Sequence, residues 1–230
     1  MQVIINEKKY ELEFVFQPIC SRESEFYFVE CLTRIKNVNF TTQEFFSSAE
    51  DKTKLNIMLS QFDLLKNNRV FFESNNLKVT INISFKNMGI LYEDPIKKVI
   101  NELDFVNLEI NELSSQLLSS SALMELSSFY KYLWLDDFGD GLSNFNLIYE
   151  RVFKYVKLDR FLFWRLFDSD NGKKMLYQLI EYLTYEGCFV VIEGIENKIH
   201  FDWFKKTSSY AGQGFFWPEM TIETLINHKS

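Results

Sequence analysis

The chain has few of the residues that interrupt secondary structure or support disulfide and zinc chemistry. Its 230 residues include only three prolines, eight glycines, three cysteines and two histidines. Because no Ser/Gly/Pro-rich stretch, low-complexity tract or repeat separates one part from another, we expect residues 1–230 to form a single domain. Cys20, Cys31 and Cys188 are odd in number and lack paired spacing, which argues against a disulfide framework and a zinc site.

Long apolar runs and an excess of positive charge are also missing. The first dozen residues contain acids and lysines rather than the core of a signal peptide, and no apolar run approaches the roughly 18 residues of a membrane span. We therefore expect a cytoplasmic protein without a membrane partner. A net charge of −7 without a clustered basic patch argues against duplex nucleic acid as a ligand. An anionic substrate would require cations that neutralise the chain's carboxylates.

Short apolar runs rich in β-favouring residues are abundant in the chain. They are ELEFVFQPI (11–19), EFYFVECLTRI (25–35), VTINIS (79–84), FVNLEI (105–110), LWLDDF (133–138), YVKLD (155–159), CFVVIE (188–193) and SYAGQG (209–214). Stretches with helical spacing separate most of them, which is typical of a buried parallel sheet covered by helices. Only residues 20–24 separate the first two runs, too few for a parallel crossover, so this pair is predicted to be antiparallel. The predicted fold is an α/β, modified TIM-type (β/α)8 barrel with one antiparallel strand.

Local signals support helices between these runs. They are the capping-box spacing of Thr41 and Glu44, the apolar stripe of Leu55, Leu59, Phe62 and Leu65, the pair Asp94–Pro95, Asp159 as an N-cap, and Gly187 after a helix that begins near Lys173.

Seven polar residues lie at or near the ends of successive predicted strands: Asn82, Glu109, Asp136, Asp137, Lys157, Glu193 and Gln213. In a parallel barrel the carboxyl ends of the strands converge on one face, so these side chains are predicted to share an active-site rim. Any single one could instead be a helix cap or a solvated residue, and it is their joint order that favours a site. Lys157 has apolar neighbours, so we expect it to face acids in the barrel mouth, with a solvated edge position as the alternative.

The oxygen ligands of this rim favour Mg²⁺ or Mn²⁺ over Zn²⁺. The donor set comprises Glu30, Asn82, Glu109, Asp136, Asp137 and Glu193. Two such ions can hold a nucleophilic water and stabilise an in-line displacement at phosphorus. Asp136 and Asp137 can both point inward only if their strand is ending, and Gly139 immediately after them indicates that it is.

The same residues fall in an ordered series of motifs. These are FQPI (16–19), ECLTR (30–34), NIS (82–84), LEINE (108–112), DDFGDG (136–141), VKLD (156–159), EGIE (193–196) and GQG (212–214). From Phe16 to Pro218 the chain resembles the EAL-domain family of cyclic di-GMP phosphodiesterases, in particular its small stand-alone enterobacterial-type members. The resemblance implies hydrolysis of cyclic di-GMP to linear pGpG with two Mg²⁺ or Mn²⁺ ions, and it implies a homodimer, with an unidentified protein partner possible.

The resemblance also implies individual roles. Those for metal binding are Glu30, Asn82, Glu109 and Asp136 at the first ion, with Asp137 and Glu193 at the second. Those for catalysis are Lys157, Glu193 and Glu30, with Lys157 orienting or activating the attacking water. Those for substrate binding are Gln17, Arg34, Gln213 and Pro218, with Arg34 on a phosphate. Glu112 and Asp140 are implied to couple the site to dimerisation.

Some positions depart from the family pattern. Cys31 replaces the signature alanine, Asn111 and Asp140 stand where the family usually has threonine or another small residue, and the segment from Gln213 to Pro218 is shortened. These departures leave a catalytically weak or inactive receptor or regulator as an alternative. A metal-dependent barrel acting on another phosphoester is a third possibility. The aromatic residues 215–217 are expected either to stack on a base or to plug the barrel end.

Overall fold

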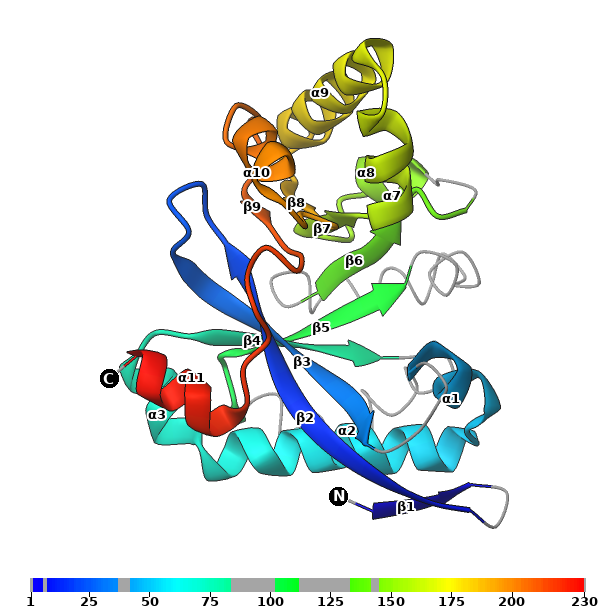
Figure 1. Cartoon of the computed structure of the whole chain (residues 1–230), viewed down its shortest axis with the longest axis vertical. Coiled ribbons are helices and arrows are strands. Elements are labelled where there is room, and N and C mark those ends of the chain that lie inside the picture. Colours follow the sequence, from blue (N-terminus) through cyan, green and yellow to red (C-terminus); the bar gives the residue numbers. More distant parts are fainter. Residues whose placement is uncertain are drawn as a thin grey trace.

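The computed structural model describes residues 2–5, 8–36, 42–83, 102–111, 133–141 and 145–229. Its centre is one sheet whose strands follow one another in chain order (Figure 1). The strands are β1 (Gln2–Ile5), β2 (Lys8–Cys20), β3 (Phe26–Lys36), β4 (Lys78–Ile83), β5 (Val106–Asn111), β6 (Leu133–Phe138), β7 (Tyr155–Leu158), β8 (Phe189–Ile192) and β9 (Ala211–Gly212).

The sheet closes into a barrel with one reversed strand, as predicted. Neighbouring strands from β3 to β9 pair in parallel. β2 is antiparallel both to β3 and, through Cys20 and Gly212, to β9, and this second pairing closes the barrel. No sequence pattern predicted β1, which pairs antiparallel with β2 outside the closed ring. Four residues at a chain end are too short a run for a period-2 pattern to indicate a strand.

Helices flank this sheet. The described ones are α1 (Thr42–Ser48), α2 (Asp51–Asn67), α3 (Arg69–Ser74), α7 (Phe145–Tyr149), α8 (Arg160–Phe167), α9 (Asp170–Tyr185), α10 (Lys198–Phe204) and α11 (Ile222–Lys229). The predicted cap at Asp159 is confirmed, because its Oδ1 accepts a hydrogen bond from Leu162 N at 2.8 Å. Gly187 follows α9 with φ +93°, a left-handed conformation that glycine adopts without strain. Thr41 and the pair Asp94–Pro95 lie outside the described residues.

The apolar stripe predicted for α2 is partly wrong. Phe62 and Leu65 are buried, but Leu59 is 37% exposed. Met58 is buried in its place, because residues 58, 62 and 65 have the i, i+4, i+7 spacing that keeps side chains on one face. No helix in the described ranges is long and apolar enough to cross a membrane.

The amino ends of the parallel strands are closed by aromatic packing. The rings of Trp134 and Tyr155, near the starts of β6 and β7, stack 4.2 Å apart. The Phe28 ring packs edge-on against Trp134 with a centroid separation of 5.0 Å. Since this end of the barrel is filled, the carboxyl ends of the strands are left to form a site.

The aromatic core also generates a stability prediction. Phe72 of α3 is fully buried and stacks on Phe105 with ring centroids 5.2 Å apart. Phe72→Ala is expected to lower the free energy of unfolding by about 3–5 kcal/mol, because it removes a ring and leaves a cavity.

Val70→Ala is the matched control, since Val70 lies on the same helix and is 79% exposed. It should change stability by less than about 0.5 kcal/mol. Urea unfolding of both variants measures the difference, and equal midpoints would contradict the packing described for α3.

Candidate active site

Lys157 lies at the centre of the carboxyl-end face and is 1% exposed. Its Nζ lies 2.8 Å from Glu193 Oε1, 2.9 Å from Glu109 Oε2, 2.9 Å from Asp136 Oδ1 and 3.1 Å from Glu30 Oε2. The prediction that Lys157 faces acids is confirmed. An ammonium group has three protons, so one lysine cannot donate a hydrogen bond to each of four carboxylates. The cluster therefore has more negative charge than its own cation can neutralise.

The backbone of β6 turns two adjacent aspartates toward one point. The pairing of β6 with β7 shifts register between Leu135 and Phe138, and Asp137 has φ +55°. This break in the strand overrides the alternation that would send Asp136 and Asp137 to opposite faces. One carboxylate oxygen from each of them and one from Glu193 lie within 4.8 Å of one another.

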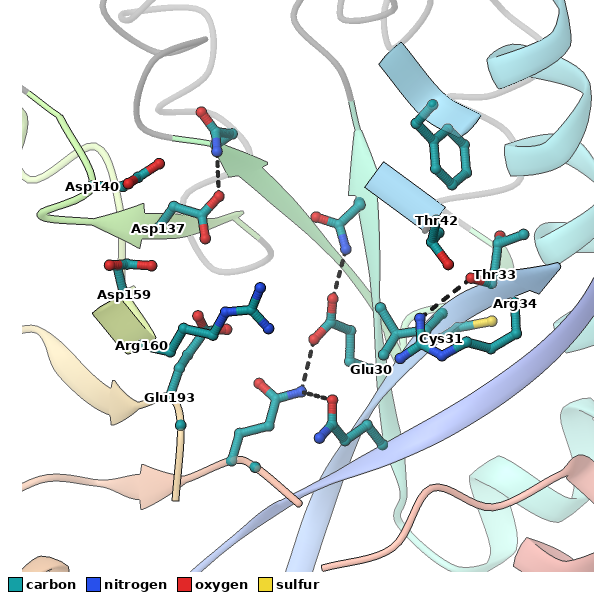
Figure 2. Close-up of a pocket in the computed structure, with 18 of the residues that line it drawn as sticks. Glu30, Cys31, Thr33, Arg34, Thr42, Asp137, Asp140, Asp159, Arg160 and Glu193 are labelled. Atoms are coloured by element: carbon teal, nitrogen blue, oxygen red, sulfur yellow. Dashed lines mark hydrogen bonds between the residues drawn. The ribbon is translucent and has the colours of Figure 1, made fainter. Parts of the chain in front are cut away.

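Amide side chains surround Glu30 and fix its orientation (Figure 2). Asn82 Nδ2 donates to Glu30 Oε1 at 2.6 Å, and Gln213 Nε2 donates to Glu30 Oε2 at 2.7 Å. Gln213 Nε2 also lies 3.4 Å from Gln17 Oε1. Strand register explains one of these positions, because Asn82 of β4 lies level with Glu109 of β5. The structure thus brings polar residues of β2, β3, β4 and β5 together with Gln213, which directly follows β9.

Most carboxyl groups of the cluster have pKa values above their ordinary ones. Burial, together with the Asp136 charge, raises the pKa of Asp137 to about 7. Burial, against the opposing effect of Lys157, raises the pKa of Glu193 to about 8. Burial also raises the pKa of Glu109 and of Asp136, which share Lys157 with the other acids. Raised values indicate that the full negative charge of the cluster is unfavourable without a further cation.

Glu30 behaves differently from its neighbours. Its burial favours the neutral acid, but Lys157 and the amide donors Gln213 and Asn82 outweigh that effect and lower its pKa. Lys157 itself has its pKa raised well above the ordinary value, since the surrounding carboxylates outweigh its desolvation. Glu30 and Lys157 are therefore the most firmly charged pair in the cluster.

The donor set fits hard divalent cations. Two buried acceptor oxygens, Glu109 Oε1 and Gln213 Oε1, have no hydrogen-bond partner among the described residues. A buried acceptor without a partner is costly unless a cation or water meets it. Carboxylate and amide oxygens are also the ligands that Mg²⁺ and Mn²⁺ prefer.

A cavity of about 630 Å³ opens above these acids. Its wall includes Gln17, and Figure 2 shows Arg34 on one side of it and Asp140 and Arg160 on another. This volume is in the range of cavities that enclose a ligand of nucleotide size. Asp140 is exposed at the rim, and its backbone N–H donates to Asp137 O at 3.1 Å.

The remaining predicted residues have different outcomes. Glu112 lies outside the described residues. Pro218 is exposed and is not among the residues that line the cavity. Cys31 is buried at 1% exposure, and burial raises its pKa, as expected for a packing residue. Asn111 donates a hydrogen bond to Asp137 and so touches the predicted metal site directly.

The aromatic segment 215–217 divides between the two expected roles. Phe215 is 67% exposed and lines the cavity, where it is available for stacking. Phe216 stacks on Phe201 with ring centroids 4.7 Å apart, and Trp217 is buried. These two rings are packing residues.

Two features of the cavity, Arg160 and the Arg34–Glu219 ion pair, were not predicted from the sequence. Arg160 follows the VKLD motif directly, so its position after a strand end was a usable signal. Arg34, the predicted phosphate contact, forms an ion pair with Glu219. No local pattern predicts that pair, because the two residues are 185 positions apart in the chain.

A largely parallel barrel with acids clustered at its strand ends, below a cavity, defines the class of TIM-type barrels with a site at the carboxyl ends of the strands. Comparison with known families narrows this class. The family model for the EAL domain matches residues 3–219, and the chain belongs to this family.

Relatives support this membership. Cyclic di-GMP phosphodiesterase PdeH of Escherichia coli K12 is 27% identical over 232 residues, which covers 96% of this chain and 90% of PdeH. The crystal structure of the EAL-like domain protein YdiV superposes with a TM-score of 0.83 at 21% identity, covering 95% of this chain and 96% of YdiV. The PaMucR phosphodiesterase in complex with c-di-GMP has a TM-score of 0.78 at 18% identity, covering 93% of this chain and 94% of that one.

The raised pKa values predict how the stability of the metal-free protein depends on pH. Asp137 and Glu193 have ordinary pKa values of 3.8 and 4.5 and folded values of about 7 and about 8. At a pH between the ordinary and the folded pKa of each group, the folded chain holds a proton that the unfolded chain has released. The free energy of unfolding should therefore fall as pH rises from about 5 to about 8.

Urea unfolding in a metal chelator at a series of pH values measures this slope. Saturating Mg²⁺ should flatten it and raise the unfolding midpoint, because the ion binds only the folded, ionised cluster. A metal-free stability that rises over the same pH range would contradict the electrostatics described for the site.

Proposed function

We propose that this protein is a cyclic di-GMP phosphodiesterase that hydrolyses its substrate to linear pGpG. The observation that supports this most directly is the cluster of Glu30, Glu109, Asp136 and Glu193 around Lys157, at the base of a cavity large enough for a nucleotide. Membership of the EAL family and the similarity to PdeH, a cyclic di-GMP phosphodiesterase, support the substrate.

The residues fall into two sets of oxygen ligands for Mg²⁺ or Mn²⁺. Glu30, Asn82, Glu109 and Asp136 would hold one ion. Asp137 and Glu193, whose oxygens lie with one of Asp136 within 4.8 Å, would hold a second. Such ions supply neutralisation of the phosphodiester charge and a more acidic water when they are bound.

The chain's own groups then orient the reaction. Water gives up a proton as its oxygen forms a bond to one phosphorus, the bond from that phosphorus to the ribose oxygen breaks, and the ribose oxygen gains a proton. Lys157 holds the acids in position and orients the water. Glu193, whose side chain is 17% exposed, faces the cavity from the edge of the cluster. Arg34 and Arg160 offer guanidinium groups to phosphate oxygens from two walls of the cavity.

Other residues that line the cavity contribute contacts to water and to the substrate. Gln17 and Gln213 support the water network beside Glu30, and the exposed ring of Phe215 stacks on a base. The homodimer, its coupling through Glu112 and Asp140, and a protein partner stay predictions from the resemblance.

Glu193→Gln and Lys157→Ala are each expected to abolish turnover, with kcat lowered by roughly a thousandfold or more. The first removes a charge from the ligand set, and the second removes the cation that orders it. Chromatography of cyclic di-GMP incubated with each purified variant and Mg²⁺ or Mn²⁺ measures the loss, and circular dichroism establishes that each variant is folded.

Glu73→Gln is the matched control, because Glu73 lies on the surface of α3 in an ion pair with Arg69 at 2.6 Å. It should turn over substrate like the natural chain. Hydrolysis retained by either site variant would contradict the assigned roles. A natural chain that binds cyclic di-GMP tightly without forming pGpG would contradict the proposed activity and favour a receptor.

A further inference from the structure

The Arg34–Glu219 ion pair is the one contact in which a cavity-lining cation is already neutralised by a carboxylate, among the residues that the structure describes. Arg34 lines the cavity from β3, and Glu219 lies outside its wall. Arg34 Nε donates to Glu219 Oε2 at 3.1 Å, and Nη2 donates to Glu219 Oε1. This is the two-pronged geometry with which a guanidinium also binds a phosphate.

Glu219 is held in place by the backbone on either side of it. Met220 pairs with Phe16 of β2 through two hydrogen bonds, Phe16 N to Met220 O at 2.7 Å and Met220 N to Phe16 O at 2.9 Å. Trp217, two residues earlier, is buried against Phe204 and Phe201. The carboxylate therefore belongs to an anchored segment, and little backbone entropy is lost when it meets Arg34.

Arg34 has an alternative acidic neighbour that it does not use. Glu13 is its direct cross-strand partner on β2, yet Glu13 pairs with Lys36 at 3.2 Å. The third donor of Arg34, Nη1, is directed to Thr33 O at 3.3 Å. Each of the three guanidinium nitrogens of Arg34, Nε, Nη1 and Nη2, therefore donates a hydrogen bond within the protein.

Arg160 provides the contrast. It extends into the same cavity beside Glu193 (Figure 2), and its guanidinium carbon lies 4.8 Å from the centroid of the Phe161 ring. The cavity thus has one arginine with a built-in counter-ion and one for which the described ranges show no side-chain ion pair.

We propose that Glu219 is an internal competitor for the phosphate site on Arg34, and that it sets the affinity of the cavity for its anionic ligand. A phosphate reaches the guanidinium only by displacing the carboxylate or by binding beside it against like-charge repulsion. The segment after Gln213, which pairs with Phe16 of β2 through Met220, brings this carboxylate to Arg34. The inference rests on the proposed function, because it takes the ligand to be a cyclic dinucleotide.

The prediction is that Glu219→Gln binds cyclic di-GMP more tightly, with the dissociation constant lowered roughly three- to tenfold. Titration calorimetry measures it with Ca²⁺ in place of Mg²⁺, and chromatography checks that the ligand stays intact. The gain in affinity should disappear when Glu219→Gln is introduced into an Arg34→Ala chain, because the guanidinium for which Glu219 competes with the phosphate is then absent.

Glu223→Gln is the control, since it removes the same charge from an exposed position in the first turn of α11. It should leave the dissociation constant unchanged. If Glu219→Gln binds with unchanged or weaker affinity while the natural chain binds, the carboxylate positions Arg34 rather than competing for it, and the inference is wrong. If neither chain binds cyclic di-GMP, the proposed function fails, and the inference fails with it.

Discussion

The structure depends on a local excess of negative charge at the carboxyl ends of the barrel strands. Lys157 is buried among four carboxylates at 2.8 to 3.1 Å, and a fifth, Asp137, lies beside them. Burying charges is costly even when they are paired, and here the pairing is incomplete. The barrel tolerates this arrangement because its core and its aromatic amino end supply stability elsewhere. The proposed function follows from the same imbalance, since bound cations would neutralise the acids and attract the phosphate of the proposed substrate.

Much of the barrel could be predicted from the sequence because its signals are local. Eight apolar runs, and the short link between the first two, were enough to predict a closed sheet with one reversed strand. What escaped prediction depended on tertiary packing. Leu59 is exposed because α2 presents Met58 to the core, and β1 exists because a partner strand is available to pair with it.

The site could be predicted to a similar extent. The apolar neighbours of Lys157 indicated that it needs acids nearby, and the adjacent pair Asp136 and Asp137 required a break in the strand, which the φ of +55° at Asp137 provides. The Arg34–Glu219 pair could not be predicted, because it depends on how the segment after Gln213 returns to β2. Chemistry carried by strand ends is visible in a sequence, whereas contacts made by a returning segment are not.

Anomalous diffraction from crystals grown with Mn²⁺ tests whether the acids around Lys157 form a site for two divalent cations. We expect two anomalous peaks, one among Glu30, Asn82, Glu109 and Asp136 and a second beside Asp137 and Glu193. A map with no peak in this cluster at saturating Mn²⁺ would contradict this expectation.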